Sequence, residues 1–138
     1  MANEAVLVTR LENPIQFTVA NGTGIEKGTV CKMADPMTAS ASSAANDIIA
    51  GIAASEKIAL DGVTTLAIYR RGIFRMKLSG GCTVGDALAS ASLSPWLNYV
   101  YQATAACSGS RIIGHALETG TDSETILVDL NIGTGAAI

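Results

Sequence analysis

The sequence of 138 residues predicts an all-β protein, folded as a compact β-barrel or β-sandwich in a single domain over residues 1–138. Three observations support this fold class. Several short apolar segments alternate between apolar and polar residues, as half-buried strands do. Glycine, present 14 times, recurs between these segments and permits sharp turns and bulges. No segment carries a sustained apolar stripe with the period of a helix, about 3.6 residues.

Strands are expected along most of the chain. Residues 1–10 are expected to hold an N-terminal arm and a first strand. Ile15, Phe17 and Val19 then share one face of a strand, and the polar residues between them share the other. The same alternation occurs in three later segments, residues 63–68, 74–78 and 126–132. The end of the chain, residues 133–138, is expected to form a flexible tail.

Three segments are less regular. Residues 38–46, TASASSAAN, are small and polar and predict an exposed loop. Residues 86–93, DALASASL, fit either a short helix capped by Asp86 or a strand followed by a turn, and the strand is favoured. Arg71 and Gly72 lie between two β-rich runs and predict a tight turn or a bulge.

The two halves of the chain resemble each other weakly, which indicates an internal duplication. Residues 48–53 are similar to residues 112–116, and both contain the pattern Gly-x-Ala. Upstream, residues 26–30 match residues 83–87. Downstream, each half has a β-rich run, and the runs align by three matches: Thr64 with Thr125, Leu66 with Leu127, and Gly72 with Gly133. Two similar β units would explain the pattern, although a sequence rich in Gly and Ala also produces such matches by chance.

The composition favours contacts with other subunits over binding to nucleic acid or membranes. Charged residues make up 15% of the chain, against about 25% in a typical soluble domain. Part of the apolar surface is therefore expected to contact other subunits, the alternative being a domain with few surface charges. A net charge of −3 argues against nucleic acid as a partner. No apolar run approaches the roughly 20 residues of a membrane span, and the N-terminus lacks a signal-peptide pattern, so synthesis in a cytoplasm is expected.

The residues that usually carry catalysis or bind metals are few and isolated. Cys31, Cys82 and Cys107 have no metal-binding spacing, so reduced thiols are expected. The one histidine, His115, has no nucleophile or orienting carboxylate in a recognisable pattern, so a structural or interface role is favoured. Four acidic residues match no calcium loop and are expected to be solvated: Glu118, Asp122, Glu124 and Asp129. The sequence therefore predicts no enzyme activity, no metal and no cofactor.

Two groups of residues are candidates for contacts with other proteins. The first is a basic cluster of Arg70, Arg71, Arg75 and Lys77. Alternation places Arg75 and Lys77 on the polar face of one strand, where they would pair with acidic groups of a partner or form an ordinary solvated face. The second group is Trp96, Tyr99 and Tyr101. Trp96 is expected in the core, and the two tyrosines are expected at a boundary position.

The order of several short motifs resembles the capsid cement, or head-decoration, proteins of tailed phages. After a short N-terminal segment, the motifs are Lys27-Gly28-Thr29-Val30, Gly51-Ile52-Ala53, Arg71-Gly72-Ile73-Phe74, Val84-Gly85-Asp86 and Ile113-Gly114-His115-Ala116. A last strand over residues 125–131 closes the pattern, so the resemblance covers nearly the full chain. Two segments depart from the family pattern: residues 38–46 are longer and richer in Ala and Ser, and DALASAS replaces a clearer β stretch.

The resemblance implies a structural virion protein, made in the host cytoplasm, that binds the major capsid protein on the outer capsid surface and stabilises the shell. It also implies self-association, as a homotrimer or a dimer. In such proteins a chain terminus often reaches over the capsid protein. The N-terminal residues are therefore the candidate capsid-binding arm: Ala2, Asn3, Glu4, Ala5, Val6, Leu7 and Val8.

Two other functions are open at this point. A phage-borne carbohydrate- or host-binding module, in a head fibre or a tail, would need exposed aromatic residues, which residues 96–101 alone offer. A small hydrolase would need a nucleophile next to a base, and the sequence has no recognisable pattern of this kind.

Overall fold

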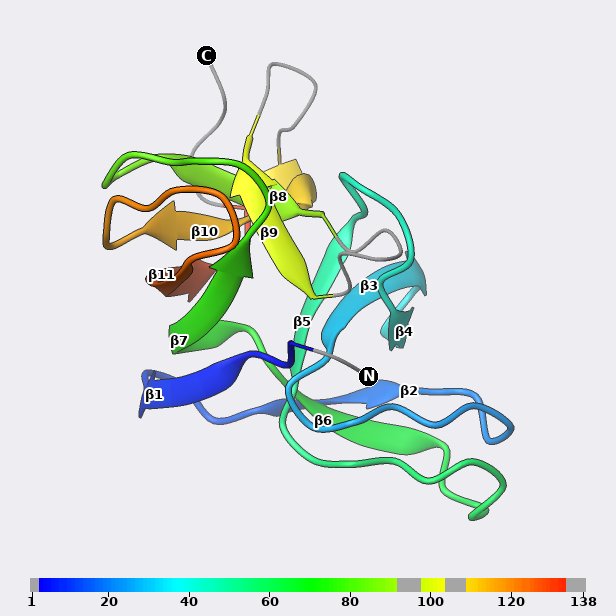
Figure 1. Ribbon diagram of the computed structural model, residues 1–138. Coiled ribbons are helices and arrows are strands. Elements are labelled where there is room, and N and C mark those ends of the chain that lie inside the picture. Colours follow the sequence, from blue (N-terminus) through cyan, green and yellow to red (C-terminus); the bar gives the residue numbers. More distant parts are fainter. Residues whose placement is uncertain (1–2, 92–97, 104–108, 134–138) are drawn as a thin grey trace.

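The computed structural model describes residues 3–91, 98–103 and 109–133, and the protein is all-β as expected (Figure 1). Over these residues it has eleven strands and one short 3₁₀ turn, Gly109–Arg111. The strands form two closed five-stranded barrels. Trp96, Cys107 and residues 134–138 of the expected tail lie outside the described residues.

The first barrel closes in the order β2-β4-β3-β5-β6. Its strands are β2 (Ile15–Thr18), β3 (Val30–Asp35), β4 (Thr38–Ala41), β5 (Ile49–Ala53) and β6 (Thr65–Tyr69). The second barrel closes in the order β7-β9-β8-β10-β11. Its strands are β7 (Arg71–Leu78), β8 (Ala87–Ser90), β9 (Tyr99–Gln102), β10 (Ile112–Ala116) and β11 (Thr125–Asn131). β1 (Val6–Arg10) pairs with β7, so the chain starts against the second barrel before it builds the first (Figure 1).

The two barrels repeat one pattern of strand pairing, which is what the expected duplication predicts. In each barrel the first and third strands pair in parallel, β2 with β4 and β7 with β9. The other neighbouring pairs of each barrel are antiparallel. The two Gly-x-Ala motifs hold equivalent places, because Gly51 pairs with Cys31 and Gly114 pairs with Leu88, each beside a bulge.

The alignment of the last strands of the two repeats was wrong by one residue. Leu66 pairs with Phe17, and Ile126 pairs with Met76. Phe17 and Met76 each come directly before the first residue of their strand that pairs in parallel, Thr18 in β2 and Lys77 in β7. Leu66 therefore corresponds to Ile126 and not to Leu127. Leu66 and Ile126 are buried, whereas Leu127 is half-buried. Strand side chains alternate with a period of two, so a slip of one residue exchanges the two faces.

Two apolar cores hold the fold together. One fills the first barrel and consists of Phe17, Val19, Ile25, Cys31, Ala39, Ala50, Ala53, Leu66 and Ile68. The other fills the second barrel and also takes Ala5, Val30, Ile49 and Ile52 from outside it. All five residues of β5 are buried, because its side chains enter both cores. Because both faces of β5 are buried, its sequence is a continuous apolar run and does not alternate with polar residues.

Polar contacts join the barrels at one side. The Asn98 side chain, ahead of β9, accepts a hydrogen bond from the Val30 amide of β3 over 3.0 Å. The hydroxyl groups of Ser42 and Ser90 lie 3.0 Å apart. The Asn46 amide donates to the Ser90 carbonyl oxygen over 2.9 Å. Most of these groups are buried, so the contacts satisfy atoms that would otherwise lose their hydrogen bonds to water.

The exposed loop expected at residues 38–46 was wrong for the first half of the segment, whereas residues 43–45 are exposed and lie outside the strands. β4 occupies its first half, and Ser42 is buried. The first barrel closes between β2 and β4, and Ala39 of β4 enters its core, where a small side chain fits. The tight turn or bulge expected at Arg71 and Gly72 was also wrong, since both lie inside β7 and the bulge of the β1–β7 pairing falls in β1, between Leu7 and Thr9. The chain bends at Arg70 instead, where it passes from one barrel to the other. The strand favoured at residues 86–93 is confirmed as β8.

Candidate interaction surfaces

The outer face of β7 carries the predicted pair of basic residues. In an antiparallel sheet, residues directly opposite each other point to the same side. Val6 of β1 and Leu127 of β11 flank Arg75, and Thr125 of β11 lies opposite Lys77. We call this surface, made of Val6, Arg75, Lys77, Thr125 and Leu127, the basic face. It combines exposed positive charge with partly exposed apolar side chains.

The basic face contains a shallow hollow of about 210 Å³. Its lining residues are Asn3, Glu4, Val6, Arg75, Lys77 and Thr125. Val6 is 58% exposed although it is aliphatic. The Lys77 ammonium lies 5.7 Å from the centre of the Tyr99 ring, within the range of a cation–π contact. The structure thus brings together residues from the candidate arm, the basic cluster and the aromatic segment.

The candidate arm is largely part of the fold. Ala5 is buried, and its amide donates to the Gly28 carbonyl oxygen over 2.8 Å. Val6, Leu7 and Val8 belong to β1. Asn3 and Glu4 line the hollow of the basic face, and Ala2 lies outside the described residues.

The other candidate contact residues lie elsewhere. Arg71 is half-buried, and its Nε is 3.8 Å from a Glu12 carboxylate oxygen. Arg70 is half-buried at the crossover between the barrels. Tyr99 is buried and not at a boundary as expected; it pairs with Lys77 on the outer side of β7, and the Lys77 ammonium lies over its ring. Tyr101 is half-buried against a small cluster with Ala89.

Glu118, Asp122 and Glu124 are exposed around the last turn, as expected, whereas Asp129 is half-buried in β11. Glu118 accepts a hydrogen bond from the Leu127 amide, and Asp122 accepts one from the Gly80 amide. Hydrogen bonds from the Thr121 amide and hydroxyl lower the pKa of Glu124. Asp129 lies opposite the half-buried His115 in the ladder of β10 and β11. Over the described ranges, no three His, Cys, Asp or Glu side chains are grouped to hold a metal ion.

The described cysteines are free thiols in apolar surroundings. Cys31 lies in the core of the first barrel, and burial raises its pKa to about 12. Burial also raises the pKa of Cys82. A thiol with a raised pKa is a weak nucleophile at neutral pH, so both cysteines act as small apolar residues.

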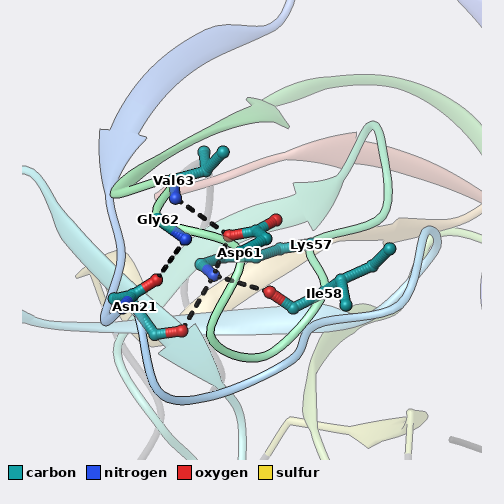
Figure 2. Close-up of polar contacts among 6 residues, drawn as sticks. All are labelled: Asn21, Lys57, Ile58, Asp61, Gly62 and Val63. Carbon is teal, nitrogen blue, oxygen red and sulfur yellow. Dashed lines mark hydrogen bonds and ion pairs between the residues drawn. The ribbon is translucent and has the colours of Figure 1, made fainter.

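Residues 57–63, here called the tip loop, form a second surface that the sequence did not reveal. Lys57 is almost fully buried, and its ammonium donates three hydrogen bonds (Figure 2). The acceptors are the Asn21 carbonyl oxygen at 3.1 Å, the Ile58 carbonyl oxygen at 3.0 Å and an Asp61 carboxylate oxygen at 2.9 Å. The same Asp61 oxygen accepts from the Val63 amide, and these bonds lower the pKa of Asp61.

The duplicated fold provides an internal comparison for the tip loop. The bridge between Ile25 and Lys57 has its counterpart between Cys82 and Gly120. Leu60 and Ser123 follow these bridges at equal spacing, and both have positive φ, 63° and 67°. The second barrel thus makes the same turn with Gly120, Thr121, Asp122 and Ser123. The tip loop has large aliphatic residues instead, and three additional residues before β6: Asp61, Gly62 and Val63.

Comparison with known proteins identifies a related fold. No protein-family model and no curated protein matches the sequence. A crystal structure of the N base of head fiber gp8.5 in bacteriophage phi29 is similar, with a TM-score of 0.54 and 14% sequence identity. The similarity covers 85% of this chain and 93% of that chain. At this identity, the similarity shows that the two proteins share a fold. The described part of this chain contains no helix that is long and apolar enough to cross a membrane.

Proposed function

We propose that this chain is a structural protein of a phage head, which binds the outer surface of the mature capsid through the major capsid protein and stabilises the shell. The observation that carries the proposal is the shared fold with the N base of a phage head fibre, over nearly the full length of both chains. The motif order that resembles capsid decoration proteins supports the same assignment independently of the fold.

The architecture suits a mechanical role. One apolar core contains side chains from both barrels, and hydrogen bonds from Val30 to Asn98 and between Ser42 and Ser90 also join them. A force on one barrel therefore passes to the other through packed side chains. Glu118, Asp122 and Glu124 accept backbone hydrogen bonds, and Cys31 and Cys82 lie in apolar cores, so these groups have structural roles. A protein that binds only the mature lattice stabilises that state by mass action, by about 2.7 kcal/mol when its free concentration is 100 times its Kd.

Capsid contact is assigned to the residues ahead of β1. Ala5 is anchored in the second core, so the segment assigned to capsid contact is shorter than the arm expected from the sequence. It consists of Ala2, Asn3 and Glu4. Self-association, as a homotrimer or a dimer, would multiply weak contacts with the shell through effective concentration.

Binding to capsids assembled without this protein tests the proposal. Purified full-length chain is mixed with such capsids, and the amount that sediments with them is measured, together with the temperature at which packaged DNA becomes accessible to a dye. Saturable binding and a higher opening temperature are expected. A chain that stays in the supernatant at every concentration would contradict the proposal. Deletion of Ala2, Asn3 and Glu4 should reduce occupancy, whereas Thr23→Ala in an exposed turn should leave it unchanged.

A second candidate is the base of a head fibre that binds host carbohydrate. The description of the similar structure as part of a head fibre favours it. This role predicts capsid binding without a change in the opening temperature of the shell, and specific retention of virions on a glycan array. The capsid experiment therefore separates the two roles.

A further inference from the structure

We propose that the tip loop of one copy docks on the basic face of a second copy of this chain. The contact rests on the self-association that forms part of the proposed function, and it names the two surfaces that meet. The tip loop supplies Ile58 and Leu60, with Glu56 beside them. The basic face supplies Val6, Leu127 and its two basic side chains.

The tip loop exposes large aliphatic side chains where the equivalent turn of the second barrel has polar ones. Ile58 is 63% exposed, Leu60 is 77% exposed, and Val63 is also exposed. The equivalent turn of the second barrel has Thr121 and Ser123 in place of Ile58 and Leu60. Since polar residues make the same turn there, the aliphatic side chains are not needed to form it. Large aliphatic side chains held in water are typical of a surface that a partner covers.

The loop is also fixed in the conformation that it presents. The Ile58 carbonyl oxygen accepts a hydrogen bond from Lys57 (Figure 2). The Leu60 amide donates to the Asn21 carbonyl oxygen over 2.8 Å. The Asn21 side chain accepts from the Gly62 amide over 2.7 Å. Leu60 has a φ of 63°, a backbone conformation that favours glycine and disfavours large side chains. A rigid loop loses little conformational entropy on binding, so these contacts prepare Ile58 and Leu60 for a partner.

The charges beside the aliphatic residues identify the partner surface. A hollow of about 330 Å³ next to Ile58 is lined by Glu26, Glu56 and Lys57; Glu56 is exposed, and the buried Lys57 ammonium is paired with Asp61. The tip loop therefore places the exposed aliphatic side chains of Ile58 and Leu60 near the exposed carboxylate of Glu56. The basic face has the opposite arrangement, with the exposed aliphatic Val6 beside Arg75 and Lys77. The exposed Glu56 carboxylate and the exposed Arg75 guanidinium carry opposite charges, each beside an exposed aliphatic side chain, which favours contact between the two surfaces.

This contact is heterologous, because it joins two different surfaces of the same chain. Heterologous contacts build a closed ring when the rotation between copies closes, and an open chain when it does not. The oligomer that this contact builds is therefore expected to depend on both surfaces at once. A variant of either one should dissociate it.

Sedimentation velocity of the purified full-length chain over a range of concentrations tests the contact. Leu60→Asp should weaken association at least 30-fold, as roughly expected for loss of a central apolar anchor. Asp tolerates positive φ and the site is exposed, so the variant should fold. Ser123→Asp, at the equivalent position of the second barrel, is the matched control and should associate as the natural chain does. Glu56→Lys and Arg75→Glu should each weaken association, and the two together should restore it.

Three outcomes would overturn the contact: a chain that is monomeric at all concentrations, an oligomer that Leu60→Asp leaves intact, or a double charge reversal that fails to restore association. Capsid binding, measured on the same variants, separates this contact from the proposed function. If Leu60→Asp lowers capsid occupancy but leaves the oligomer intact, the tip loop touches the shell instead, and the proposed function stands. If the natural chain associates through the tip loop but never binds capsids, the proposed function fails and the contact stands.

Discussion

Gly114 of β10 is the position where one added methyl group should do most damage. A Cβ atom built on Gly114 would lie 1.9 Å from the Asp129 carbonyl oxygen of β11 and 2.9 Å from the carbonyl carbon. The nearby Asn131 amide nitrogen would be 3.1 Å away. These are backbone atoms of the neighbouring strand, so no side-chain rotation can relieve the overlap. Gly114→Ala is therefore expected to force β10 and β11 apart.

The cost follows from the geometry. An ordinary carbon–oxygen contact is about 3.4 Å, so the strands must separate by roughly 1.5 Å at this point. Hydrogen bonds of about 2.9 Å do not survive that displacement. Two lost ladder bonds cost about 1 kcal/mol each, and the overpacking of the sheet costs about 2 kcal/mol more. The free energy of unfolding should fall by about 4 kcal/mol, which corresponds to a Tm lower by roughly 12 °C for a chain of this size.

Thermal and urea unfolding, followed by circular dichroism, measure this effect. Gly22→Ala is the matched control, because its added Cβ atom would meet nothing within 4 Å, and Tm should stay within about 3 °C of the natural chain. Gly51→Ala should behave like Gly114→Ala, since its Cβ atom would lie 2.1 Å from the Tyr69 carbonyl oxygen. A Gly114→Ala protein with an unchanged Tm would refute the close approach of β10 and β11.

Three further predictions concern single groups. The pKa of Asp61 is lower in the folded than in the unfolded protein, so its carboxylate stabilises the tip loop at neutral pH. This stabilisation is lost as the pH falls below about 4 and through the folded-state pKa. Amide hydrogen exchange in the tip loop should accelerate at that pH, and unchanged protection would contradict the prediction. Cys31, with a pKa of about 12, should not react with a thiol reagent at pH 8 in a folded Cys107→Ser protein, and rapid labelling would show that the core is open. Asn98→Ala leaves the buried Val30 amide without its partner and should cost about 2 kcal/mol of unfolding free energy in urea titration; a loss below about 0.5 kcal/mol would argue against that bond.

Much of the strand content was predictable because alternation is a local pattern. β7 and β11 each bury one face, so their apolar residues recur at every second position and can be identified without knowing the partner strands. In β2 the alternation is also present, but only Phe17 is buried and Ile15 is exposed. The same rule placed Arg75 and Lys77 together on the outer side of β7. The Gly-x-Ala repeat was visible because the close approach of neighbouring backbones restricts Gly51 and Gly114 to glycine.

Other features depend on contacts between distant residues. β4 was missed because its small residues resemble a loop, and the burial of Ala39 arises only when the first barrel closes around its core. The repeat was aligned one residue out of register, because Leu127 and Ile126 are both aliphatic and only the pairing with β7 distinguishes them.

The sequence by itself determined that the chain forms short strands separated by glycine, that it repeats, and that two basic residues share a face. The tertiary structure alone decided that Lys57 is buried and that Ile58 and Leu60 are held out in water. The physical reason is that the Lys57 ammonium is satisfied in part by the carbonyl oxygen of Asn21, which lies 36 residues away along the chain. A pattern within one segment cannot encode a contact that exists only after the barrel has closed.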